Sequence, residues 1–276
     1  MKRYNPISCL LFSMCLSFFL LAETAWAAPC ITSNSTCTEW VVVAGGPPRA
    51  LIYRTYAMDT KNVSITRALI MIHGATRDAG DYFRTALAAA FLAGALNDTI
   101  VIAPRFAANN ADDDCRDTLA RDELNWTCGL RRPGSWRSGG AALGHAEIAS
   151  YDVIDEILLK LARKDVFPNL STIVVAGHSG GGTFTMRYEM ANHVHEKLGV
   201  PVTYFAANAA AYVYLDAVRP TASAYPVTAA APGYIPANPA DPFVPFPDAL
   251  TVAALTDGPM ACGTGRDIVP GSPTIS

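Results

Sequence analysis

Residues 171–182, with the sequence Ser-Thr-Ile-Val-Val-Ala-Gly-His-Ser-Gly-Gly-Gly, decide the fold of the chain. An apolar, β-branched run leads into the motif Gly177-x-Ser179-x-Gly181, and a helix-compatible segment follows at 183–198. A strand, a tight turn and a helix in this order are typical of a nucleophile elbow, where small residues flank a serine with an exposed hydroxyl. The helix N-terminus would favour negative charge developing beside that serine. The alternative is an ordinary strand–helix turn of small residues.

A second motif lies upstream of the elbow. The residues His73-Gly74-Ala75-Thr76 follow another apolar run, 68–73. With these two motifs, the stretch 40–208 resembles the α/β-hydrolase superfamily, in its secreted esterase and lipase-like branch. The expected substrate class is therefore a small-molecule or lipid ester.

The resemblance implies a role for each residue of the two motifs. Ser179 would be the nucleophile that attacks a carboxylic ester and forms an acyl-enzyme. The backbone N–H groups of Ala75 (or Thr76) and Gly180 would hold the oxyanion. Because backbone groups do this work, His73 is expected to be a structural residue.

Strand-like segments alternate with helix-like segments along the chain. The apolar runs 68–73 and 99–104 are typical of central parallel strands buried on both faces. We therefore expect an α/β fold: a mostly parallel, doubly wound sheet with helices on both faces, incomplete at the C-terminus. Active sites of such sheets lie outside the carboxyl ends of the strands. The expected strands are 38–44, 51–58, 68–73, 99–104, 172–176 and 202–208, and the expected helices are 80–96, 146–164 and 183–198.

Residues 1–27 are typical of a cleaved export signal. Lys2 and Arg3 precede an apolar run at 7–22, and Ala25-Trp26-Ala27 fits a small-residue cleavage site. The run is short for a membrane span, so we expect an exported protein of the periplasm or the extracellular space. Residues 28–215 would form the hydrolase core, and residues 216–276 a Pro/Ala-rich irregular tail.

Export makes disulfide bonds possible. Two of the seven cysteines lie in the expected signal segment. The others suggest two local pairs, Cys30–Cys37 and Cys115–Cys128, and leave Cys262 as an odd residue. The alternative for any of them is a buried free thiol.

The composition argues against several classes of partner. Charged residues make up 16% of the chain and the net charge is −3, so nothing indicates nucleic acid binding. The acidic run 112–114 lacks the spacing of a calcium-binding loop and fits a solvated loop better. No cysteine or histidine pair has zinc spacing, and we expect no metal and no cofactor. Trp126, Trp136 and Tyr82 could border a substrate pocket or simply pack in the core.

The catalytic base is the missing part of the expected site. In the superfamily the acid and then the histidine follow the serine, but only His193 and His195 follow Ser179. Both are expected on the helix that starts at the elbow, roughly 21–24 Å along its axis and beyond hydrogen-bond reach. His178 adjoins the serine, and neighbouring side chains at an elbow point apart. Asp216 is a candidate acid, with a turn residue as the alternative.

The tail lacks the alternation of strands and helices that precedes it. A truncated chain or a shifted reading frame would explain this, together with the odd Cys262. Two hypotheses follow. The chain is an exported serine hydrolase that acts on carboxylic esters, or it is a non-catalytic remnant or binding module that keeps the core without the chemistry.

Overall fold

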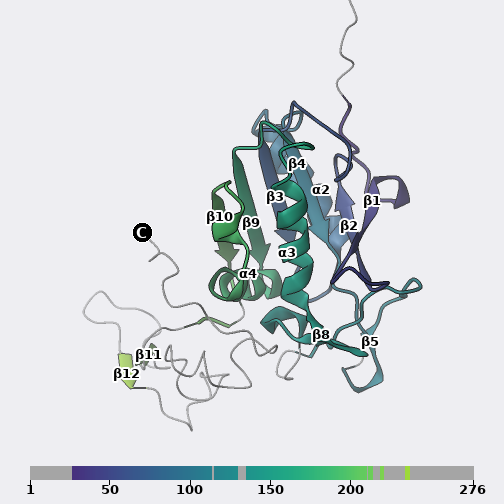
Figure 1. Ribbon diagram of the computed structural model, residues 1–276. Helices are drawn as coiled ribbons and strands as arrows, with labels where there is room; N and C mark the ends of the chain where they lie inside the picture. The colour runs from purple at the N-terminus through teal and green to yellow at the C-terminus, as the bar shows by residue number, and fades with distance from the viewer. Residues whose placement is uncertain are drawn as a thin grey trace, which may run out of the picture.

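A six-stranded sheet forms the centre of the computed structural model, which describes residues 27–113, 115–129, 135–209, 211–213, 218–220 and 234–236. The strand order is β1-β2-β4-β3-β9-β10 (Figure 1). The strands are β1 (Thr38–Val42), β2 (Arg49–Arg54), β3 (Arg67–Ile72), β4 (Thr99–Pro104), β9 (Thr172–His178) and β10 (Val202–Ala207).

The sheet is mostly parallel. β3 pairs in parallel with β4 and β9, and β9 pairs in parallel with β10. β2 is antiparallel to both of its neighbours, β1 and β4. Every residue of β4 is buried, which is typical of a central strand covered on both faces.

Helices cover both faces of this sheet, so the expected α/β fold with a mostly parallel sheet and helices on both faces is confirmed. Side chains of β3 alternate between two cores. Ile70 and Ile72 share one with apolar residues of α3 and α4, while Leu69 and Met71 pack with α2 on the opposite face. Figure 1 shows α3 in front of the sheet, running roughly along its strands. The helices are α2 (Ala79–Leu92), α3 (Ser150–Leu161) and α4 (Gly180–Ala191).

The segment expected to be a helix from residue 146 begins instead as a strand. β8 (His145–Ala149) pairs antiparallel with β7 (Ala141–Ala142), and α3 starts only at Ser150. The side chain of Asp152 accepts the N–H of Ala149 at 2.6 Å and caps the first turn of α3.

The helix after the elbow is also shorter than expected. α4 ends at Ala191, and Asn192 follows with extended backbone angles. The side-chain Nδ2 of Asn192 donates to the carbonyl oxygen of Glu189 at 3.0 Å, which satisfies a group left unpaired at the helix end. The expectation that this helix continues to residue 198 and carries both later histidines is therefore wrong.

A folded insertion lies between β4 and α3, beyond the carboxyl ends of the central strands (Figure 1). Trp126 and Trp136 are fully buried, with ring centroids 5.4 and 5.2 Å from that of Phe106. Both tryptophans are therefore core residues. The disulfide bond Cys115–Cys128 closes the insertion as expected. Besides β7 and β8, its elements are β5 (Asn109–Asn110), η2 (Ala111–Asp113), β6 (Cys115–Arg116) and η3 (Trp136–Ser138).

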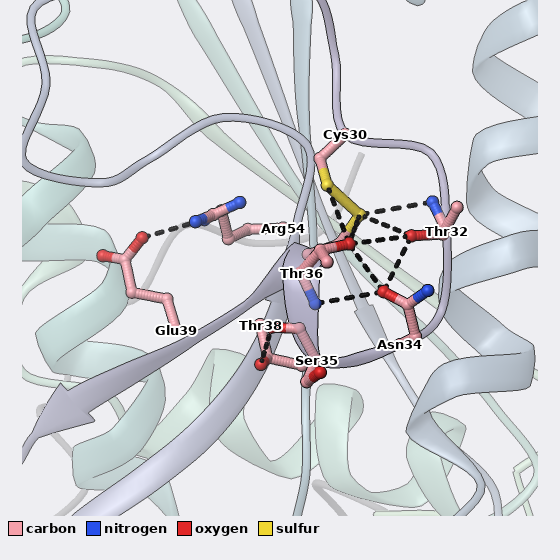
Figure 2. Close-up of a disulfide and its surroundings, with 9 residues drawn as sticks. Cys30, Thr32, Asn34, Ser35, Thr36, Thr38, Glu39 and Arg54 are labelled. Atoms are coloured by element: carbon pink, nitrogen blue, oxygen red, sulfur yellow. Dashed lines mark hydrogen bonds and ion pairs between the residues drawn. A yellow bond between two sulfur atoms is a disulfide. The ribbon is translucent and has the colours of Figure 1, made fainter.

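The N-terminal disulfide bond, Cys30–Cys37, was also expected and is present. Figure 2 shows it beside Asn34, whose Oδ1 accepts the N–H of Thr36 at 3.0 Å. The N–H of Cys30 donates to the carbonyl oxygen of Thr55, just after β2, at 2.7 Å. The bridge therefore fixes the segment before β1 against the end of β2.

Two short strands follow the main sheet in the chain. β11 (Val218–Pro220) and β12 (Tyr234–Pro236) pair antiparallel with each other. Asp216, Cys262 and most of the expected export signal lie outside the described residues. Among the helices that the structure describes, none is long and apolar enough to cross a membrane.

Replacing both Cys30 and Cys37 with alanine is expected to lower the free energy of unfolding by about 2 kcal/mol, because the unfolded chain gains conformational entropy without the bridge. Urea denaturation measures this difference. As a control, a reducing agent should still destabilise the variant, which keeps Cys115–Cys128. An unchanged denaturation midpoint would contradict the prediction.

Candidate active site

Ser179 holds the strained backbone conformation of an elbow. Its φ is 57° and its ψ −116°, a region that costs a non-glycine residue about 1–3 kcal/mol. Its N–H donates to the carbonyl oxygen of Ala207 in β10 at 3.0 Å, and its carbonyl oxygen accepts the N–H of Thr183 in α4 at 3.1 Å. These two hydrogen bonds hold the half-buried serine between the sheet and the helix.

The glycines around Ser179 leave no room for a side chain. A methyl group on Gly177 would collide with the carbonyl oxygen of Gly181, and one on Gly181 would collide with the carbonyl oxygen of Ile72 at the end of β3. A methyl group on Gly182 would collide with the carbonyl oxygen of Ala207. The backbone of α4 therefore approaches β3 and β10 as closely as glycine alone permits.

The two expected oxyanion donors belong to segments that touch. A methyl group on Gly180 would lie 3.1 Å from the backbone nitrogen of Ala75, in the loop after β3. Gly180 is the first residue of α4, where backbone N–H groups lack a partner within the helix. The arrangement brings Ala75 and Gly180 together beside Ser179, and their role as donors stays a prediction.

His73 is completely buried and engaged on both ring nitrogens. Its Nε2 accepts the N–H of Phe106 at 3.0 Å, so the proton is on Nδ1, which donates to the carbonyl oxygen of Gly74 at 2.9 Å. Burial lowers the pKa of His73 to about 4, which favours the neutral ring. His73 therefore fastens the loop after β3 to the end of β4 and has no free nitrogen to act as a base.

His178 is exposed, and its ring is held by two neighbours. The side-chain nitrogen of Asn208 lies 3.2 Å from Nε2, and the hydroxyl of Tyr82 lies 3.3 Å from Nδ1. Burial raises the pKa of Tyr82, and the charge of Asp78 adds to this effect. Both ring nitrogens of His178 are therefore engaged by residues other than Ser179.

His193 and His195 also lie away from the elbow. His195 contacts Asn192 and Tyr204, with Nδ1 2.7 and 3.1 Å from their polar side-chain atoms. His193 comes after α4, a helix of 12 residues and so roughly 18 Å long. Across the described part of the chain, no hydrogen bond reaches the hydroxyl of Ser179. The structure therefore brings together the residues expected to act as nucleophile and oxyanion donors, and none of the described side chains lies within hydrogen-bond reach of the Ser179 hydroxyl to act as a base.

Arg137, in η3, is a residue near the elbow that the sequence analysis did not single out. It is 5% exposed, and a methyl group on Gly180 would lie 3.2 Å from its Nε. Its Nε and Nη1 are buried without a hydrogen-bond partner. No sequence signal distinguishes it, because an arginine in a polar, glycine-rich segment is ordinarily solvated.

Other arginines near the carboxyl ends of β3 and β4 are neutralised. Arg77 binds both carboxylate oxygens of Asp117 at 2.6 and 3.1 Å, and these contacts oppose the effect of burial so that the pKa of Asp117 is lowered. Arg105 forms an ion pair with the buried Glu123 at 3.1 Å. Arg137 differs from both in having no carboxylate partner within the described part of the chain.

The described residues contain no group of three or more acidic, cysteine or histidine residues that could hold a metal ion. A cavity of about 310 Å³ lies at the amino end of β10, lined by residues such as Glu189 and Tyr204. Because it is at the opposite end of the sheet from Ser179, we assign the site by the geometry of the elbow and not by this cavity.

Comparison with known proteins gives similarity at the level of structure. No family model and no curated protein matches the sequence. Similar solved structures include the LpqC poly(3-hydroxybutyrate) depolymerase from Bordetella parapertussis, with 18% identity, TM-score 0.41 and coverage of 62% of this chain and 50% of that chain. Poly(aspartic acid) hydrolase-1 from Sphingomonas sp. KT-1 has 21% identity and TM-score 0.42, with coverage of 65% and 59%.

A third similar structure is EstE1, a thermostable carboxylesterase from a metagenomic library, with 15% identity, TM-score 0.37 and coverage of 80% and 59%. The chain thus spans 50–59% of the length of these three structures. In its own topology, the mostly parallel sheet covered by helices on both faces is α/β-hydrolase-like.

Gly181→Ala is expected to lower the free energy of unfolding by about 3 kcal/mol or more, because the new methyl group must displace the backbone of β3. Thermal denaturation followed by circular dichroism measures the loss. The matched control is Gly80→Ala in the first turn of α2, where a methyl group meets only ordinary contacts and improves helix propensity. Equal stability of the two variants would contradict the close approach.

The neutral state of His73 predicts a pH dependence. Its folded pKa of about 4 lies below the ordinary value of 6.5. The contribution of the neutral ring to the free energy of unfolding is therefore complete above about pH 6.5 and is lost as the pH falls towards 4. The loss is about 3 kcal/mol in wild type relative to His73→Gln. Urea denaturation of both proteins at several pH values measures this difference. Groups with the opposite pH dependence, such as Asp155 with its pKa raised to about 6 by burial, are present in both proteins and cancel in the comparison.

If the His73→Gln variant does not fold, the ring of His73 in wild type can be followed by NMR. We expect no titration of this ring above about pH 5. A midpoint near 6.5 would show that the ring is hydrated and would overturn its structural assignment.

Proposed function

We propose that this protein is a serine hydrolase of carboxylic esters, with Ser179 as the nucleophile. One observation carries the proposal. Ser179 occupies a strained turn at the N-terminus of α4, with Gly180 and Ala75 beside it. Strain of this kind persists only where the surrounding structure enforces it, and it gathers at active sites.

The reaction would proceed in two halves. The Oγ of Ser179 forms a bond to the ester carbonyl carbon, and the carbonyl oxygen takes the negative charge between the N–H groups of Ala75 and Gly180. The bond to the alcohol then breaks, the alcohol leaves with the proton that the Ser179 hydroxyl gave up, and an acyl-enzyme remains. Water attacks the same carbon in the second half, which releases the carboxylic acid and restores the serine hydroxyl.

The proton of Ser179 has no acceptor among the described side chains, so the proposed reaction is slow in the chain as it stands. Loss of the histidine of a complete triad costs about 10⁶-fold in turnover, with a residual contribution from the oxyanion donors and substrate binding. The proposed acid, Asp216, lies outside the described residues. An ester-binding module that keeps this site without turnover is therefore the second candidate function, and the engaged rings of His73 and His178 favour it.

We also propose that the chain is exported by the signal segment 1–27. The two disulfide bonds of the described residues, Cys30–Cys37 and Cys115–Cys128, support this proposal, because disulfide bonds persist mainly in oxidising compartments. Fractionation of expressing cells followed by N-terminal sequencing tests it. A protein that stays inside the cell with its first residues intact would refute export.

A fluorophosphonate probe is expected to label wild type on Ser179 and to leave Ser179→Ala unlabelled. Labelling should be slow, because no described base activates the hydroxyl. Tandem mass spectrometry identifies the modified residue. The matched control is Ser171→Ala, at the opposite end of β9, which should be labelled like wild type. Equal labelling of wild type and Ser179→Ala would refute the proposed function.

A further inference from the structure

The guanidinium of Arg137 is a buried cation without a counter-charge. The residue is 5% exposed, and its Nε and Nη1 are buried without a hydrogen-bond partner. Its guanidinium carbon lies 5.4 Å from the ring centroid of Trp136, a contact of modest strength. No ion pair to Arg137 occurs within the described ranges of the chain.

Such a cation is costly to the fold. Burial of a charge without a partner costs several kcal/mol, and an arginine stays protonated at neutral pH. Burial lowers the pKa of Arg137, and the charge of Arg77 lowers it further. The carboxylate of Asp117 already pairs with Arg77, so it does not neutralise the charge of Arg137.

The position of this cation is next to the proposed oxyanion donors. One point in space, a methyl position on Gly180, lies 3.2 Å from the Nε of Arg137 and 3.1 Å from the backbone nitrogen of Ala75. The Nε of Arg137 and the backbone nitrogen of Ala75 therefore both pack against the backbone of Gly180, the residue that follows Ser179.

We propose that Arg137 makes the Ser179 site selective for esters that carry a carboxylate, with the guanidinium as its counter-charge. This deepens the proposed function, on which it rests. A carboxylate is the ligand that a planar guanidinium binds best, through parallel N–H···O bonds. A carboxylate present in the bound substrate neutralises Arg137 in the ground state, so the effect is on binding and not only on turnover.

The test compares two esters of the same shape in the Ser179→Ala background, where no turnover interferes. Monomethyl succinate carries one carboxylate at neutral pH, and dimethyl succinate is neutral. Isothermal titration is expected to show the monoanion binding about 10-fold more tightly or better, as charged hydrogen bonds allow. Adding Arg137→Gln should abolish this preference. Adding Arg84→Gln, at an exposed arginine of α2 that pairs with Asp81, should leave it unchanged.

A separate measurement guards against a merely structural role. Arg137→Met keeps the length of the side chain and removes the charge, so its Tm is expected to rise by about 2–4 °C. A lower Tm would show that the guanidinium stabilises the fold and would overturn the proposal. Equal affinity for the two esters, or a preference that survives Arg137→Gln, would also overturn it.

The two proposals can fail separately. If a fluorophosphonate does not label Ser179 but the preference for the monoanion depends on Arg137, the catalytic assignment fails and the anion site stands. If Ser179 is labelled and the two esters bind equally, the hydrolase assignment stands and Arg137 has no role in recognition.

Discussion

The close approach of three backbone segments at Gly177 and Gly181 is the constraint on which the rest of the structure depends. The carbonyl oxygens of Ile72 and Gly181 occupy the space that methyl groups on these glycines would need. Because the segments are in direct contact, the backbone of the turn between β9 and α4 is restricted to one tight conformation. Ser179 is forced to a positive φ, and the first turn of α4 meets the loop after β3. The placement of Ser179 and of the two proposed oxyanion residues thus depends on glycines, which have no side chains to keep these segments apart.

Buried hydrogen bonds also hold the closely packed segments in place. The ring of His73 joins the loop after β3 to Phe106, in the segment that follows β4. The hydroxyl of Tyr188 in α4 donates to the carboxylate of Asp155 in α3 at 2.6 Å, so the two helices on that face are joined by a polar contact within an apolar core. Buried polar groups that are satisfied in this way give a packed core a single arrangement. Arg137 is the contrast, since its charge is buried near the same elements without such a partner.

Much of this arrangement could be predicted from residue patterns alone. Continuous apolar runs such as β4 identify strands that are buried on both faces, and the spacing of the glycines around Ser179 identifies the elbow. The end of α4 was missed because the segment after Ala191 has a composition compatible with a helix, and the stop lies in the extended backbone and side-chain hydrogen bond of Asn192. Arg137 could not be found in this way, because its significance lies in burial and in contacts between segments far apart in the chain. A sequence pattern records local periodicity, and it does not record which distant groups converge.

The energetic cost of the site favours a binding role over a site that has lost all use. A strained Ser179 costs about 1–3 kcal/mol, and an unpaired buried guanidinium costs more. Both lie within the same few ångströms around Gly180, while the described acidic groups elsewhere, such as Asp117 and Asp155, have partners. A region free of function would relax either feature through many single substitutions, since an apolar residue at Arg137 or a glycine at Ser179 removes the cost. The unpaired charge of Arg137 is best explained by an anionic ligand that neutralises it, and the strained backbone of Ser179 by the exposed hydroxyl that the elbow presents beside it. Recognition of an anionic ligand does not require a histidine, so this argument holds whether or not the bound ester is turned over.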